Sequence, residues 1–252
     1  MKKITGLVIM GMLLVLYLAP KAEARLGVLV SPFSLDLREI NRVLDEEFNE
    51  EYGTELRLEE NGLMYSLALE RWVSLNWSNM VEIDRRIDLS FCQIGTSDSY
   101  SYTTVSYAPD RLPVTIRYDV DVELGIIAAP IFYTRIYRKL PVGDMSPYLG
   151  IGVGTVLTDL MVSRKATLYF FHPDGYLQGT KKESWSQHFT SVPLAGQVLA
   201  GIEYRLGRKM TFLLEGRYII SAKAEIRDKD AGIKADVDAS GLSYRVGVVI
   251  GF

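Results

Sequence analysis

The sequence predicts an all-β protein: an eight-stranded antiparallel up-and-down transmembrane β-barrel with one short helix in its first long loop. Three observations support this fold class. Apolar and polar residues alternate with a period of two along most of the chain, which is typical of sheets whose two faces differ. Long and short connections follow each other in strict alternation. The chain also begins with a cationic and then apolar leader.

The first 24 residues have the three parts of a secretory signal peptide. A short cationic start is followed by an apolar stretch from Thr5 to Leu18, and Ala22, Glu23 and Ala24 give the small-x-small pattern of a cleavage site. A membrane-anchor helix is the alternative, but this stretch is shorter than the roughly 20 residues that a spanning helix needs. We therefore expect cleavage after Ala24, which leaves residues 25–252 as the barrel domain.

Composition argues against several classes of protein. The chain carries 28 Lys and Arg against 31 Asp and Glu, and this mildly acidic balance argues against a nucleic-acid partner. Its one cysteine, Cys92, cannot form an intrachain disulfide, and we expect a buried apolar thiol there. We find no metal-ligand spacing and no phosphate-binding loop in the sequence, so we predict neither a metal nor a cofactor.

The alternation defines eight segments that we expect to be strands. These are residues 26–33, 62–72, 80–91, 114–136, 148–159, 192–205, 211–224 and 241–252. The connections at 34–61, 93–112, 160–190 and 225–240 are long and polar, whereas the other three are short. A meander with all its long loops at one end produces this pattern.

Alternation alone does not say which face meets water, because a soluble barrel is apolar inside and a membrane barrel is apolar outside. Several segments reach the roughly 9–11 residues with which a tilted strand crosses a bilayer. Aromatic residues lie near strand ends, as in the girdles of membrane barrels, at Trp72, Trp77, Tyr133, Tyr137, Tyr148, Tyr204 and Phe252. We therefore predict an outer apolar band and a polar lumen.

The polar faces then place a network of charges inside the barrel. Buried charges are costly unless they are paired, so mixed signs on neighbouring strands favour a plug of ion pairs, and a narrow polar conduit is the alternative. We expect Gly150, Gly152 and Gly154 to make room for bulky neighbours. The predicted network consists of Glu82, Asp84, Arg86, Asp88, Arg117, Asp119, Asp121, Glu123, Gln197, Glu203, Glu215, Arg217 and Arg245.

The carboxyl-terminal segment, YRVGVVIGF, resembles the C-terminal signal of bacterial outer-membrane β-barrels. Its apolar residues alternate back from the last aromatic residue, at Tyr244, Val246, Val248, Ile250 and Phe252. SPYLGIGVGTVL (146–157) and AGIEYRLGRKMTFLLEGRYII (200–220) are similar to the small eight-stranded barrels of the OmpA/OmpX/OmpW-like superfamily.

This resemblance implies a place in the outer membrane of a diderm bacterium, among lipid and lipopolysaccharide. It also implies assembly by the barrel-insertion machinery, which reads the last strand. Unlike for full-length OmpA, we expect no periplasmic peptidoglycan-binding domain after the barrel, and we expect a monomer. Because short turns of such barrels are periplasmic, we expect both termini in the periplasm and four extracellular loops.

The first long loop combines a helical pattern with many acidic residues. Leu37, Ile40, Val43, Leu44 and Phe48 recur at helical spacing, which predicts an amphipathic helix at 36–51. Asp36 with Glu39 suggests a capping box, and Gly53 a helix end. We expect the helix to pack over the barrel mouth. A lid, or a divalent-dependent contact with anionic lipopolysaccharide, is the alternative.

The third long loop contains both histidines, His172 and His188. Nothing in their spacing from nearby serines establishes the Ser–His pair, oriented by a third group, that nucleophilic catalysis needs. The loop is also rich in aromatic and basic residues, which can mark a binding surface or pack together: Tyr169, Phe170, Phe171, Tyr176, Lys181, Lys182 and Trp185.

We therefore predict a non-enzymatic barrel that acts as a structural anchor and displays four loops for surface interaction. An OmpW-like channel for small solutes, hydrophobic ones included, is the first alternative. A lipid A-modifying outer-membrane enzyme is the second.

Overall fold

A computed structural model describes residues 24–72, 81–106, 113–139, 141–227 and 234–251. The predicted signal peptide and Phe252 therefore lie outside the described residues, apart from Ala24 itself. No helix in the described segments is both long and apolar enough to cross a membrane.

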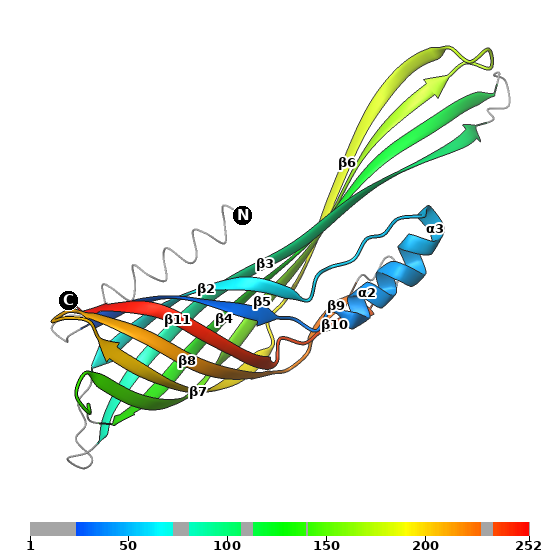
Figure 1. Ribbon diagram of the computed structural model, residues 1–252. Helices are drawn as coiled ribbons and strands as arrows, with labels where there is room; N and C mark the ends of the chain where they lie inside the picture. The colour runs from blue at the N-terminus through cyan, green and yellow to red at the C-terminus, as the bar shows by residue number, and fades with distance from the viewer. Residues whose placement is uncertain (1–23, 73–80, 107–112, 140, 228–233, 252) are drawn as a thin grey trace.

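The main sheet closes into a ring of eight antiparallel strands, which we call the barrel (Figure 1). Around the ring they are β4 (Val114–Lys139), β3 (Val81–Ser106), β2 (Asn61–Trp72), β1 (Ala24–Ser34), β11 (Gly241–Gly251), β8 (Met210–Ser221), β7 (Leu194–Arg205) and β5 (Met145–Phe171). The first and last strands pair with each other, and β4–β5 pairing completes the ring. The predicted eight-stranded barrel is confirmed, and closure satisfies the backbone groups that an open edge would leave unpaired in lipid.

Three of the predicted loops contain strands instead. β3 continues through most of 93–112 and pairs there with β4, which begins at Val114. β5 continues into 160–190, where the chain returns as β6 (Leu177–Ser191). β9 (Ala224–Arg227) and β10 (Lys234–Val237) form a small hairpin within 225–240. The loop predictions for these regions are wrong, because segments rich in polar residues also form strands when one face of the sheet is packed and the other is exposed to solvent.

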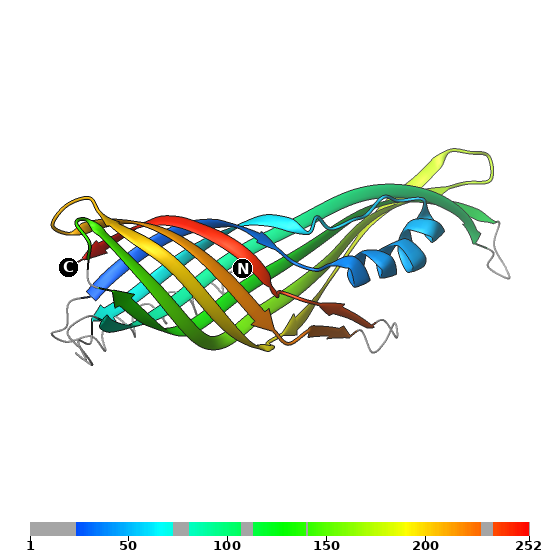
Figure 2. The same cartoon turned by 60° about the horizontal axis from the view of Figure 1, so that its bottom comes forward.

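The continued strands project from one end of the barrel as a curved sheet, opposite the end where β1 begins and β11 ends (Figures 1 and 2). We call this sheet the extension. It comprises 93–106 of β3, 114–127 of β4, 159–171 of β5, and β6.

The predicted helix is present beside the extension (Figures 1 and 2). It consists of α2 (Arg38–Leu44), a π-helical turn η1 (Asp45–Asn49) and α3 (Glu50–Tyr52). It ends where predicted, at Gly53, whose φ of 65° is the left-handed conformation that glycine adopts without strain.

The predicted capping box does not form. Leu37 occupies the N-cap and makes no side-chain capping bond. Asp36 Oδ1 instead accepts the backbone N–H of Arg38 at 3.2 Å. Glu39 Oε2 accepts the backbone N–H of Asp236 in β10 at 3.0 Å. The Glu39 carboxylate therefore binds a backbone N–H that is distant in the sequence instead of the N-terminus of its own helix.

Glycines in β5 allow close approach of its neighbours, as predicted. A Cβ on Gly152 would lie 2.5 Å from Thr134 Oγ1, and one on Gly154 would lie 1.9 Å from the backbone oxygen of Ile131. The second contact involves backbone, which cannot rotate away, so even alanine would force β4 and β5 apart at that position.

Candidate functional site

The outer surface of the barrel is apolar. In β11 the exposed fractions of Tyr244 and Ile250 are 61% and 46%, whereas Arg245 between them is fully buried. Val246 and Val248 also point outward, so the predicted face of this strand is confirmed for its described residues. An apolar outside and a charged inside invert the order found in soluble barrels, and this is the design of an outer-membrane β-barrel.

The aromatic girdle is present only in part. Tyr133, Tyr137 and Tyr204 lie exposed on the outer surface, as predicted. Tyr148 is wrongly placed in the prediction, because it is buried inside the barrel, where its hydroxyl donates to Glu215 at 2.8 Å. The side chains of Trp72 and Trp77, like Phe252, lie outside the described part of the chain.

The barrel interior holds a layer of charged side chains, which we call the charge layer. Its described members are five arginines and five carboxylates, so their formal charges balance. All except Arg25 are buried. They are Arg25, Glu70, Asp84, Arg86, Asp88, Arg138, Glu203, Glu215, Arg217 and Arg245.

The half of the charge layer nearer the short turns is built around Arg138 of β4. Its guanidinium pairs with Glu203 at 2.5 Å, with Glu70 at 3.4 Å and with Asp84. Arg25 of β1 reaches Glu203 at 2.9 Å and Glu70 at 3.4 Å. Five strands are therefore linked across the lumen.

The other half is built around Glu215 of β8. Its carboxylate accepts hydrogen bonds from Arg86 at 2.7 Å, from Arg245 and from the Tyr148 hydroxyl. Asp88 completes the group, at 3.0 Å from Arg86 and 3.1 Å from Arg245. Such pairing offsets the large cost of removing these charges from water.

Arg217 lies at the end of the charge layer that faces the extension. Its guanidinium donates to Met64 Sδ at 3.3 Å and, at the limit of a hydrogen bond, to Ser243 Oγ at 3.5 Å. Its Nη1 has no partner among the described residues. Gln197, also a predicted member, donates to Asp88 at 3.2 Å and to Thr134 at 2.6 Å.

Four predicted members of the network lie outside the lumen, which corrects the prediction. Arg117, Asp119, Asp121 and Glu123 belong to the extension and point outward; Arg117 pairs with Asp119 at 2.9 Å, and Glu123 with Lys165 at 3.0 Å. In this part of β4 the charged side chains face outward and the apolar side chains face inward. The Glu82 side chain lies outside the described residues.

Three members of the charge layer were not predicted: Arg25, Glu70 and Arg138. Glu70 and the buried Ser66 are four residues apart in β2, so both side chains point to the same face of the strand. The polar residues on that face were the signal that could have placed Glu70 in the lumen. Arg138 follows the predicted end of its strand by two residues, and Arg25 precedes the first predicted strand by one. Strand ends set too short hid both.

The change from polar to apolar interior occurs along one row of the sheet. Met64, Cys92, Ala128 and Thr158 are register partners across β2, β3, β4 and β5. Cys92 is buried there as a free thiol, as expected. Beyond this row, the inward side chains of β4 are apolar, from Ile126 through Leu124 and Val122 to Val120.

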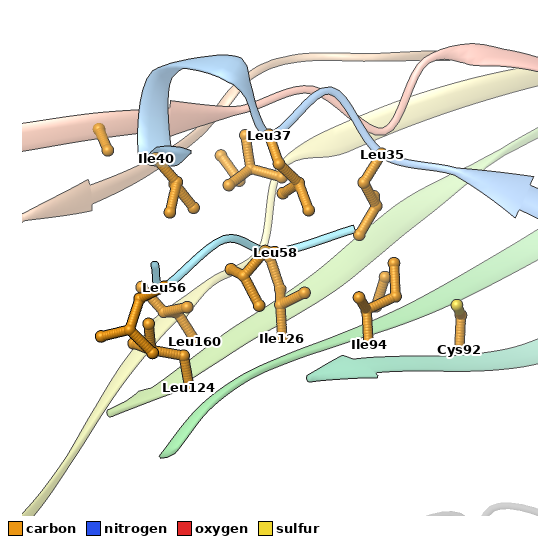
Figure 3. Close-up of a cluster of buried hydrophobic side chains, with 14 of the residues drawn as sticks. Leu35, Leu37, Ile40, Leu56, Leu58, Cys92, Ile94, Leu124, Ile126 and Leu160 are labelled. Carbon is orange, nitrogen blue, oxygen red and sulfur yellow. The ribbon is translucent and has the colours of Figure 1, made fainter. Parts of the chain in front are cut away.

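The extension and the first long loop share a hydrophobic core (Figure 3). Leu37 and Ile40 of the helical segment and Leu56 and Leu58 of the returning chain lie over Leu124 of β4, and all are buried. The apolar face of the predicted helix is therefore buried. It packs against the extension, and not only over the mouth of the barrel as predicted.

Two asparagines join the helix to the returning chain. The buried Asn41 donates to Leu58 O at 3.0 Å and accepts from Leu58 N at 2.9 Å. Asn49 makes the same pair of bonds with Leu56, at 2.9 and 3.0 Å. Each amide satisfies two backbone groups that would otherwise be unpaired beside an apolar core.

A cavity of about 1020 Å³ lies between the helix and the extension, and we call it the helix–sheet cavity. Its walls are mostly apolar, with Ile40, Leu44 and Phe48 on the helix side and Val122 and Leu160 on the sheet side. Its size is at the upper end of small-molecule sites, which span about 300–1,000 Å³.

Charged groups of the helix–sheet cavity lie on β5 and β6. Lys181 and Glu183 line it and pair with each other at 2.7 Å. Arg164 lines it half-buried, and its guanidinium forms no hydrogen bond or ion pair within the described segments. Nearby, burial raises the pKa of Tyr100, and the Arg164 charge opposes that rise.

The histidines make other contacts than a Ser–His pair. His188 Nδ1 lies 3.1 Å from Asp159, which also accepts from Thr190 at 2.9 Å. His172 contacts Asp174 at 3.1 Å and stacks on Tyr176. The described residues contain no cluster of His, Cys, Asp and Glu suited to hold a metal ion.

No protein-family model and no curated protein matches the chain. Among solved structures it is similar to Neisserial surface protein A, with 13% identity, a TM-score of 0.40, and coverage of 91% of this chain and 97% of that one. OprG from Pseudomonas aeruginosa has 15% identity, a TM-score of 0.37 and coverage of 92% and 96%. Ail of Yersinia pestis has 12% identity, a TM-score of 0.31 and coverage of 92% and 100%. The likeness is one of fold.

Proposed function

We propose that the protein is a non-enzymatic outer-membrane anchor whose barrel holds the extension at the cell surface for interaction. The observation that carries this proposal is the charge layer, in which carboxylates and guanidinium groups from opposite walls fill the lumen. Short turns of such barrels are periplasmic, so the extension at the other end would face the outside of the cell.

The ion pairs favour a rigid barrel. Arg86 on β3 is bonded to Glu215 on β8, and Arg138 on β4 to Glu203 on β7. These contacts connect strands that are not neighbours in the ring. A cross-braced barrel suits an anchor, and the extension continues three of its strands without a hinge.

The remaining parts of the proposal concern assembly. We propose that the mature chain begins at Arg25 and that the barrel-insertion machinery reads the outward face of β11. We further propose a monomer in contact with lipopolysaccharide.

Ion conductance in planar bilayers tests the anchor. We expect the refolded chain 25–252, identified as folded by its heat-modifiable gel mobility, to show no discrete channel steps. The matched variant is Arg86→Ala with Glu215→Ala, which removes one charge of each sign from the charge layer and should produce steps. Reproducible steps from the unaltered barrel, of the same size as in the variant, would contradict the anchor.

A channel for small solutes, hydrophobic ones included, is the second candidate, because the helix–sheet cavity is large and apolar. The charge layer lies between this cavity and the short-turn end of the barrel, so a continuous path would have to pass it. The same conductance experiment therefore decides between the two functions.

A further inference from the structure

We propose that the helix–sheet cavity binds a single-chain amphiphile with an anionic headgroup, namely a long-chain carboxylate, with its chain on the apolar walls and its headgroup at Arg164. This inference rests on the proposed function in that it names a ligand for the surface that the anchor displays. The evidence for the ligand comes from the helix–sheet cavity and does not change if the lumen conducts ions.

The walls provide the site for the chain. Side chains of the helix (Ile40, Leu44, Phe48) face side chains of β4 and β5 (Val122, Leu160) across the cavity. Burying apolar surface is favourable by about 25 cal/mol per Å², so an alkyl chain that covers these walls would gain free energy in proportion to the apolar area that it buries.

The headgroup site follows from the charges. The ion pair between Lys181 and Glu183 neutralises itself, which leaves the Arg164 guanidinium as the uncompensated charge on the described lining of the cavity. Guanidinium groups bind carboxylates through two parallel hydrogen bonds. The charge complement of this cavity is therefore a single negative headgroup.

A second donor lies close by. The Tyr100 side chain is 8% exposed, and its hydroxyl has no hydrogen-bond partner among the described residues. Its ring lies 5.9 Å from that of Phe48, which lines the cavity. A buried polar group without a partner is costly, and a carboxylate held by Arg164 would supply the missing acceptor.

Trp185 offers a direct readout, because it lines the cavity and is the register partner of Arg164. The chain has three tryptophans, so Trp72→Phe and Trp77→Phe leave Trp185 as the only one. We would reconstitute this chain in phosphatidylcholine nanodiscs and titrate it with a brominated long-chain fatty acid. We expect saturable quenching of Trp185, and weaker quenching by the uncharged methyl ester of the same acid.

Three variants locate the headgroup. Arg164→Gln should weaken binding by about tenfold, equal to about 1.4 kcal/mol, and Arg164→Lys should restore part of it. Lys165→Gln is the matched control, because Lys165 is the next residue on the strand but points outward to Glu123. It should leave binding unchanged. Heat-modifiable mobility confirms that each variant is folded.

Quenching that never saturates, equal binding of acid and ester, or equal loss in the Arg164→Gln and Lys165→Gln variants would each overturn the inference. A barrel that is silent in planar bilayers but fails these tests would keep the anchor and lose the ligand. A barrel that conducts but passes these tests would keep the ligand and contradict the anchor.

Discussion

The barrel and the extension share three strands, β3, β4 and β5, in which even-numbered residues face inward in both regions, yet their interiors have opposite chemistry. In β4 the even-numbered side chains point inward throughout, and they change from Val122 and Leu124 in the extension to Thr134 and Arg138 in the barrel. The outward side chains change in the reverse sense, from Glu123 to Tyr133. The surrounding solvent, and not the phase of the strand, decides which face is polar.

This difference predicts different weaknesses. Ion pairs between buried side chains hold the barrel interior, where removal of one partner leaves an uncompensated charge. Hydrophobic contacts and a few amide bonds hold the extension, where surface charges are solvated. The following changes should therefore separate the two regions.

The largest effect should come from Glu215→Gln in the charge layer. This carboxylate accepts from Arg86, Arg245 and Tyr148, and its loss leaves two buried arginines to share Asp88. We expect the free energy of unfolding to fall by about 3–5 kcal/mol, measured by urea titration of the refolded barrel with tryptophan fluorescence.

Glu123→Gln in the extension is the matched control. The Glu123–Lys165 pair is 3.0 Å long, with about half of each side chain exposed, and such pairs contribute about 0–1 kcal/mol. Equal losses in the two variants would mean that the two regions do not differ in the way proposed here.

A smaller and local effect should follow from Asn41→Ala at the helix. The backbone N–H and C=O of Leu58 would lose their partner beside the core, at a cost of about 1–3 kcal/mol. Amide hydrogen exchange at Leu58 should accelerate accordingly, while the heat-modifiable mobility of the barrel stays unchanged. Arg42→Ala removes only the exposed pair with Glu46 and should change the exchange at Leu58 little. An equal acceleration in Arg42→Ala would show that the Asn41 hydrogen bonds do not hold Leu58.

The sequence was sufficient for the features that depend on periodicity. The eight-stranded ring, the outward face of β11 and the apolar face of the helix all follow from the spacing of apolar residues. Asp84, Arg86, Asp88, Glu203, Glu215, Arg217 and Arg245 were placed inside for the same reason, and the structure buries them.

Periodicity could not show where a strand leaves the membrane. Arg117, Asp119, Asp121 and Glu123 alternate with Tyr118, Val120 and Val122. Such alternation is the same in a strand that crosses a bilayer and in one that lies beyond it, so the assignment of these charges to the lumen was wrong. The length of β4, 26 residues, was the available signal, since about 9–11 residues suffice to cross a bilayer. The helix–sheet cavity depends on contacts between distant segments, which spacing along one segment does not encode.

The smallest effect concerns a solvent-exposed ion pair at the start of the helix, Asp36 with Arg38. It tests whether exposed ion pairs contribute less to stability than the buried ion pairs of the charge layer. Hydrogen bonds of 2.9 and 2.6 Å from the Arg38 guanidinium lower the pKa of Asp36 to about 2. Because this folded-state pKa lies below the ordinary value of 3.8, the pair stabilises the fold above that value, and its contribution is lost as pH falls through about 2.

Since 38% of the Asp36 side chain and 81% of the Arg38 side chain are exposed, the contribution should be no more than about 1 kcal/mol. Titration of the Asp36 carboxyl by NMR should give a midpoint near 2 in the unaltered chain and a higher midpoint in Arg38→Ala. An unchanged midpoint would show that Arg38 is not the cause. A loss of stability as large as that of Glu215→Gln would show that water does not weaken ion pairs at this end of the molecule, and the contrast between barrel and extension would then need another origin.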